Sequence, residues 1–222
     1  TKDLIDHLRE GDIDKYDYVF ARSYFGNANF LDILSRRSLK ESNRLPDTSL
    51  SKWVLSIDAE ILAFISVTTR INAYEMMGEL DKAKLKEYET SLESTYKKIH
   101  NGKSYKKLLN TMDNLSNLVK KLPTVSKNLS EEIDIINRLV INAKLYSDAN
   151  IRMAETWNEI IKFYSDNINN IDDIHSNSSL ITTFNDILRR QGFAQVEVAR
   201  YAEEYTKVST EFTKIAPKLF SL

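Results

Sequence analysis

The sequence predicts an all-α protein in which long antiparallel helices form a helical bundle. Apolar residues recur at helical spacing through almost every segment of the chain. The 222 residues include only five glycines and three prolines, too few for the many tight turns that an all-β fold requires. Hydrophobic residues make up 42% and charged residues 28% of the chain, a composition typical of a folded protein rather than a disordered one.

The first predicted helix covers residues 14–41, where one face is apolar at helical spacing. The run 43–49 interrupts this pattern, because Pro46 disfavours helical geometry in the residue before it. A second helix is predicted from Leu50 to Gly78. Residues 80–99 then either continue that helix or form a separate helix that hinges at Gly78.

The second half of the chain is predicted to contain three more helices. Asn101 and Gly102 mark the end of the helix before them. The first covers residues 105–122 and is followed by a break at Pro123. The second is a long stretch from Asn128 to about Ile174, and the last helix begins near 176–179 and stops before Pro217.

The long stretch limits the possible architectures. A helix of roughly 45 residues is about 65–70 Å long. Such a rod either forms a long antiparallel coiled coil or runs through two four-helix bundles stacked in tandem. We therefore predict a single elongated all-α domain over residues 1–222. A break at 43–49 and a second bundle module that shares the long helices are both compatible with it.

The sequence offers no motif for catalysis. It contains no cysteine, and its three scattered histidines do not form a zinc motif. The adjacent acid pairs Glu131–Glu132 and Glu203–Glu204 point to different helix faces, so their carboxyl groups do not converge as acid–base catalysis requires. We expect a protein that is not an enzyme and that has neither a metal site nor a cofactor.

The chain also lacks an initiator Met, a signal-like segment and an unbroken apolar run of about 18–20 residues. A sequence that starts at Thr1 and stops at Leu222 without these features is expected to be a fragment of a longer protein.

Lysines are concentrated between residues 97 and 127, where the one acid is Asp113. One interpretation is a basic face that attracts anionic lipid head groups or acidic proteins. The other is a solvated face that pairs with the acid-rich helix after it. Nucleic acid is not an expected partner, because the cluster has no arginine and a single aromatic residue. Its members are Lys97, Lys98, Lys103, Lys106, Lys107, Lys120, Lys121 and Lys127.

Two arginines are candidate ligand-binding residues. Arg70 lies on a helix whose neighbouring turns are apolar, and a guanidinium that faces a bundle core requires an anion or a carboxylate partner. Arg190 lies close to Gly192, where the missing side chain would let a ligand or a helix approach. The alternative is that both arginines pair with nearby acids or reach solvent. Trp53 and Trp157 fall in apolar stripes and are predicted to belong to the core.

A series of segments occurs in a recognisable order. Arg138 is followed by the stretch 150–161, a polar break at 176–179 and a helix with Arg189-Arg190-Gln-Gly, while Thr69-Arg70-Ile71 stands in the earlier helix. Over residues 50–210 this order resembles the nitrate- and nitrite-sensing (NIT) domain of bacterial receptors. The resemblance implies tandem helical bundles and an anion held by one arginine from each of two helices. Arg70 matches the first of these by position, and Arg190 is the residue nearest to the second.

The sequence thus predicts a ligand-sensing, extracytoplasmic (periplasmic) domain of a bacterial transmembrane receptor. It would bind a small anion between helices and signal by helix displacement. The alternative is a BAR-like dimeric helical scaffold, cytoplasmic and peripheral to the membrane, whose lysines meet anionic lipid or a protein partner. A homodimer is expected, and membrane contact would occur only through segments outside this chain or through the basic face.

Overall fold

The computed structural model describes residues 13–125, 129–169 and 177–219. Within these ranges the regular structure is helical and contains no strand, which confirms the all-α helical bundle. The helices are α2 (Ile13–Arg44), α3 (Leu50–Met76), α4 (Lys82–Asn101), α5 (Lys103–Val125), α6 (Ser130–Asn167) and α7 (Ser178–Leu219).

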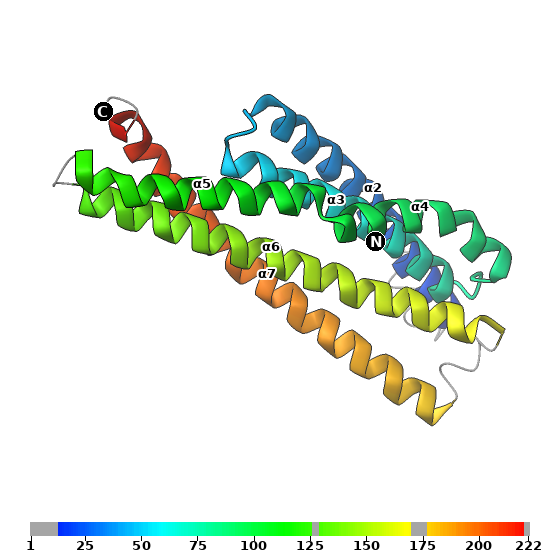
Figure 1. Cartoon of the computed structure of the whole chain (residues 1–222). Helices are drawn as coiled ribbons and strands as arrows, with labels where there is room; N and C mark the ends of the chain where they lie inside the picture. The colour runs from blue at the N-terminus through cyan, green and yellow to red at the C-terminus, as the bar shows by residue number, and fades with distance from the viewer. Residues whose placement is uncertain (1–12, 126–128, 170–176, 220–222) are drawn as a thin grey trace, which may run out of the picture.

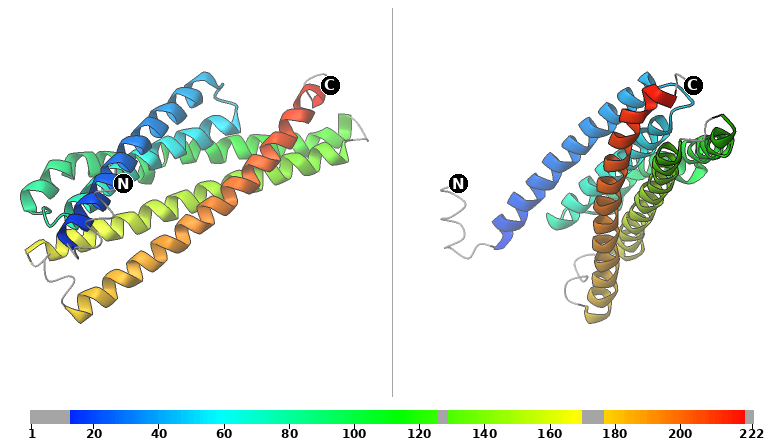
Figure 2. Two further views of the ribbon diagram at one scale, coloured as in Figure 1. Left: turned by 180° about the vertical axis from the view of Figure 1, so that it is seen from behind. Right: turned by 90° about the vertical axis from the view of Figure 1, so that its left-hand side faces the viewer.

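The helices form two hairpins and one kinked rod (Figure 1). α2 packs along α3, α6 packs along α7, and α4 and α5 follow one another along one side of an elongated molecule. α3 is central, because it contacts α2, α4, α5 and α6. α7 crosses α6 obliquely, as the view from behind shows (Figure 2).

Two glycines separate the helices around α4. Gly78 and Gly102 have left-handed backbone angles, with φ of 66° and 58°, that glycine adopts without steric cost. Residues 82–101 are therefore a separate helix, and the chain hinges at Gly78 rather than continuing α3. Asp81 caps α4, since its carboxylate accepts a hydrogen bond from the Lys84 backbone N–H at 2.7 Å.

Three predicted helix ends differ from the structure. α5 continues through Pro123 to Val125, although a break was predicted at Pro123. α7 continues through Pro217 to Leu219, although its end was predicted before the proline. A proline in the last turn removes a single backbone hydrogen bond, which neighbouring turns tolerate. The long predicted stretch corresponds to α6, which ends at Asn167, earlier than predicted. Its predicted first and last residues, Asn128 and Ile174, lie outside the described residues.

The main core runs along the molecule and includes Phe64, Leu108 and Tyr164, which are fully buried. Trp157 belongs to this core and Trp53 packs against it. A second, smaller cluster unites α5, α6 and α7 around Val119, Leu129 and Ile136. The smaller cluster thus lies at the end of the bundle where α5, α6 and α7 pack together.

No helix in the described ranges is both long enough and apolar enough to cross a membrane.

Candidate functional site

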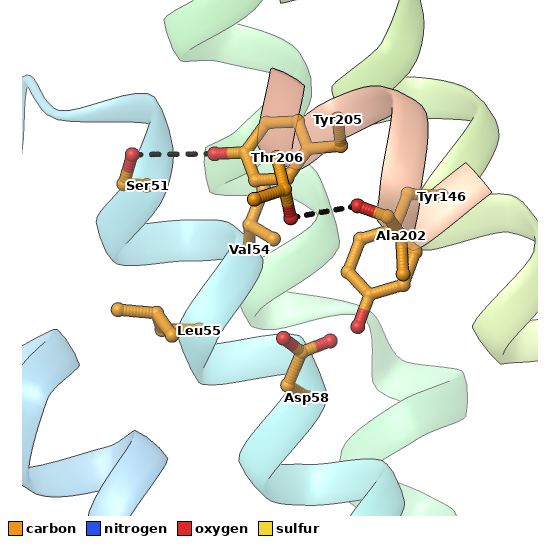
Figure 3. A pocket seen from close by; sticks show the side chains of 8 residues that line it. All are labelled: Ser51, Val54, Leu55, Asp58, Tyr146, Ala202, Tyr205 and Thr206. Carbon is orange, nitrogen blue, oxygen red and sulfur yellow. Dashed lines mark hydrogen bonds between the residues drawn. The ribbon is translucent and has the colours of Figure 1, made fainter. Parts of the chain in front are cut away.

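A pocket of about 280 Å³ lies where α7 passes α3 and α6 (Figure 3). The residues from α3 recur three or four positions apart, so they share one face of the helix, and those from α7 do the same. The pocket is lined by Ser51, Val54, Leu55 and Asp58 of α3, Tyr146 of α6, and Ala202, Tyr205 and Thr206 of α7.

Asp58 is the one charged side chain among the described residues that line this pocket. Asp58 is half-buried and lines the pocket. Asn150 Nδ2 donates a hydrogen bond to Asp58 Oδ1 at 3.3 Å, and the Tyr146 hydroxyl points toward the carboxyl group (Figure 3). No lysine or arginine forms an ion pair with Asp58 in the part of the chain that the structure describes.

Burial raises the pKa of Asp58 to about 7, and the hydrogen bond from Tyr146 opposes this rise. An ordinary aspartate has a pKa of about 3.9. A carboxyl group that is strongly desolvated inside a pocket is typical of functional sites.

Two tyrosines form the aromatic part of the pocket. The rings of Tyr146 and Tyr205 are stacked, with centroids 6.0 Å apart and planes 9° from parallel. The Tyr205 hydroxyl and Ser51 Oγ are 3.2 Å apart, which ties α7 to α3. Burial raises the pKa of both tyrosines, so both hydroxyls remain protonated near neutral pH. The pocket therefore combines one carboxyl group, aromatic faces and hydroxyl groups.

Arg70 lies between α3 and α2, where acceptors surround its guanidinium group. Nη2 forms an ion pair with Asp32 Oδ2 at 2.6 Å and donates to Asn29 Oδ1 at 2.9 Å. Nη1 donates to the Ser66 carbonyl at 3.3 Å. Burial alone would raise the pKa of Asp32, but hydrogen bonds with Ser66 and Arg70 hold it below the usual value. Asp32 thus supplies the negative charge that Arg70 requires.

Arg190 lies between α7 and α6 and is also paired. Its Nη1 is 2.6 Å from Glu159 Oε2 on α6, and its Nε is 3.1 Å from Asp186 Oδ2 one turn earlier on α7. The contacts of Arg190 therefore involve α6 and α7, whereas those of Arg70 involve α2 and α3. Among the described residues the two arginines share no partner, and carboxylates already neutralise both.

The described lysines of the cluster lie at the end of α4 and along α5, and all of them are exposed. Lys121 interacts with another residue, and the other described lysines of the cluster form no ion pair with a described residue. The acids of α6 are used elsewhere: Glu159 pairs with Arg190, and Asp134 pairs with Arg138. In the described ranges the other lysines of the cluster form no ion pair with the acids of α6. Lys127 lies outside them.

Asp58 was missed by the sequence analysis, although its position carries a signal. It lies four residues after Val54 and three before Ile61, both of which are buried, so helical spacing alone places this acid on the core side of α3. An acid at such a position requires a partner or a shifted pKa. The contributions of Tyr146 and Tyr205 could not be read from spacing, because both residues lie far from Asp58 in the sequence.

Comparisons of the chain with protein-family models, with curated proteins and with solved structures found no match. The resemblance to the NIT domain therefore stays a prediction. Within the described ranges, no group of three His, Asp or Glu side chains is placed to hold a metal ion.

Proposed function

We propose that this chain is a small-molecule-binding helical module, and that its ligand is a small organic cation held by Asp58. The observation that carries the proposal is a carboxyl group inside a pocket with no basic side chain among its described lining residues. The proposal keeps the predicted sensor class but reverses the charge of the predicted ligand.

A primary ammonium group fits the pocket on three grounds. It would neutralise the ionised carboxylate, whose charge is costly while it is desolvated and unpaired. The faces of Tyr146 and Tyr205 favour a cation through the ring quadrupole. The hydroxyl groups of Ser51 and Thr206 offer further acceptors. With about 280 Å³ available, the ligand would have only a few carbon atoms.

The position of the pocket supports a role in signalling. A ligand at Asp58 would touch α3, α6 and α7 together, next to the Ser51–Tyr205 hydrogen bond. Ligand binding that favours one packing of α7 against α3 would shift the population of helix positions. The placement of the chain in an extracytoplasmic receptor domain rests on the sequence resemblance alone.

The direct test measures thermal unfolding at pH 8, where Asp58 is mostly ionised. Propylammonium should raise the Tm of the wild-type protein, while the neutral propanol and the anion propionate should not. Asp58→Asn should abolish the increase. Glu60→Gln is the matched control, because Glu60 lies on the same helix but outside the pocket lining, with Ser104 as its partner at 2.6 Å.

Other outcomes would overturn the proposal. It fails if propylammonium has no effect, or if Asp58→Asn retains the full increase in Tm. The same assay tests the original anion hypothesis with nitrate: an increase in Tm that chloride does not produce and that Arg70→Ala removes would return the ligand site to the arginines.

A second candidate function is the membrane-binding scaffold, favoured by the exposed lysines around the α4–α5 kink that lack ion pairs with described residues. Anionic vesicles should then bind the protein, neutral vesicles should not, and binding should weaken with salt. Charge reversal of Lys103, Lys106 and Lys107 to Glu should remove the binding. Reversal of Lys40, Lys82 and Lys86, which changes the net charge equally, should preserve it. Equal binding of the two triple variants would exclude a specific basic face.

A further inference from the structure

We infer that a second groove, between α2, α3, α6 and α7, binds a neutral molecule with an apolar body and a carbonyl group. The groove has a volume of about 570 Å³ and is separate from the Asp58 pocket, because the two have no described lining residue in common. Buried side chains of α3 and α6, including Ile65 and Ile160, form its deeper part. The more exposed Leu31 of α2 and Leu188 of α7 contribute to its rim.

Two hydrogen-bond donors in the lining have no acceptor in the described part of the chain. These donors, the indole Nε1 of Trp157 and the amide Nε2 of Gln191, are buried and lack a hydrogen-bond partner there. The two side chains are 9% and 8% exposed. A buried donor without a partner is costly, so a ligand that supplies an acceptor gains affinity by satisfying it. Both residues line the same groove, Trp157 from α6 and Gln191 from α7.

The charge of the lining indicates which kind of acceptor fits. Among the described residues, no Asp, Glu, Lys or Arg lines the groove. Thr69 and Gln191 line the groove, but the adjacent Arg70 and Arg190 do not. Arg70 is paired with Asp32, and Arg190 is paired with Glu159. A carboxylate or an inorganic anion would lose its hydration there without meeting a positive charge. A ketone or amide oxygen avoids this penalty and still offers an acceptor to these donors.

The two tryptophans of the chain make the test specific, because each contributes one indole N–H signal to a ¹H–¹⁵N correlation spectrum. The Trp53 indole N–H already donates to the Asp47 carbonyl at 2.9 Å and serves as the internal control. Hexan-2-one is the probe, and hexanoate and hexylammonium are probes of the same chain length that carry a charge. Hexan-2-one should shift the Trp157 indole signal in a saturable manner and leave the Trp53 signal in place.

Two variants complete the experiment. Gln191→Leu should weaken the binding of hexan-2-one about tenfold, since one of the two donors is lost while the apolar volume is kept. Asp58→Asn should bind hexan-2-one like the wild type, so failure of this groove and failure of the amine site are distinguishable. An undisturbed Trp53 signal shows that each variant is folded.

The inference is overturned if hexan-2-one leaves the Trp157 signal unmoved, or if hexanoate or hexylammonium saturates that signal at lower concentration than the ketone. It is also overturned if Gln191→Leu retains wild-type affinity.

Discussion

Arg70 of α3 and Asp32 of α2 form an ion pair with Nη2 and Oδ2 2.6 Å apart. Both side chains are partly buried, with exposures of 19% and 31%, and both also contact Ser66. The pair therefore fixes the register of the first hairpin at a point where water screens the charges only in part. It occupies the guanidinium group that the sequence offered either to a ligand or to a nearby acid.

Removal of this ion pair should destabilise the fold. Arg70→Ala is expected to lower the free energy of unfolding by about 1–2 kcal/mol. This loss lies between those typical of removing an exposed ion pair and of breaking a buried one. A double-mutant cycle with Asp32→Asn in urea unfolding should show that the two losses are not additive. Arg37→Ala is the control, because Arg37 is exposed and has no ion pair among the described residues. Additive losses would mean that the pair contributes nothing.

Asp58 should make stability depend on pH with a defined sign. Its pKa is about 7 in the folded protein, compared with about 3.9 in the unfolded chain. As the pH rises from 4 to 7, the unfolded chain releases the proton of Asp58 while the folded protein retains it. The free energy of unfolding therefore falls across this range, by up to about 4 kcal/mol, and the loss is complete above the folded-state pKa.

The variant Asp58→Asn isolates this effect from the other carboxyl groups. It should be more stable than the wild type at pH 8, and the difference should shrink to near zero at pH 4. Urea titrations of both proteins across this range measure the difference. Parallel curves for the two proteins would show that Asp58 has the same pKa in the folded and unfolded states.

Gly102 should be sensitive to substitution because of its backbone angle rather than its surroundings. With φ at 58°, alanine at this position is strained, whereas a Cβ atom would meet only ordinary contacts, the nearest at 3.7 Å from the His100 carbonyl. Gly102→Ala is expected to lower the free energy of unfolding by about 1 kcal/mol.

Gly26 provides the contrasting case, since it lies inside α2 and a Cβ atom added there would meet no described atom within 4 Å. Gly26→Ala should stabilise the protein by about 0.5–1 kcal/mol through its higher helix propensity. Thermal unfolding followed by circular dichroism measures both changes. A loss of stability in both variants would contradict the explanation by backbone angle.

Much of the fold could be predicted from the sequence because helix formation is largely local. The apolar spacing of residues three and four apart identified the helical segments. Pro46 and Gly102 identified breaks, because each restricts or permits particular backbone angles whatever surrounds it. The sequence did not decide whether α4 continues α3, since helical spacing runs on past Gly78. The left-handed angle at Gly78 settled this question.

The candidate sites depended on the tertiary structure. The sequence singled out Arg70 and Arg190 as charged residues close to apolar turns or a glycine, but their partners Asp32 and Glu159 lie on other helices and could not be paired with them by spacing. Asp58, Tyr146 and Tyr205 come from three helices and meet only where α7 crosses α3 and α6. Local spacing determines which face of a helix is buried. Which side chains meet on that face, and whether a charge there finds a partner, is decided by the crossing of helices that are distant in sequence, and so by the packing of the whole bundle.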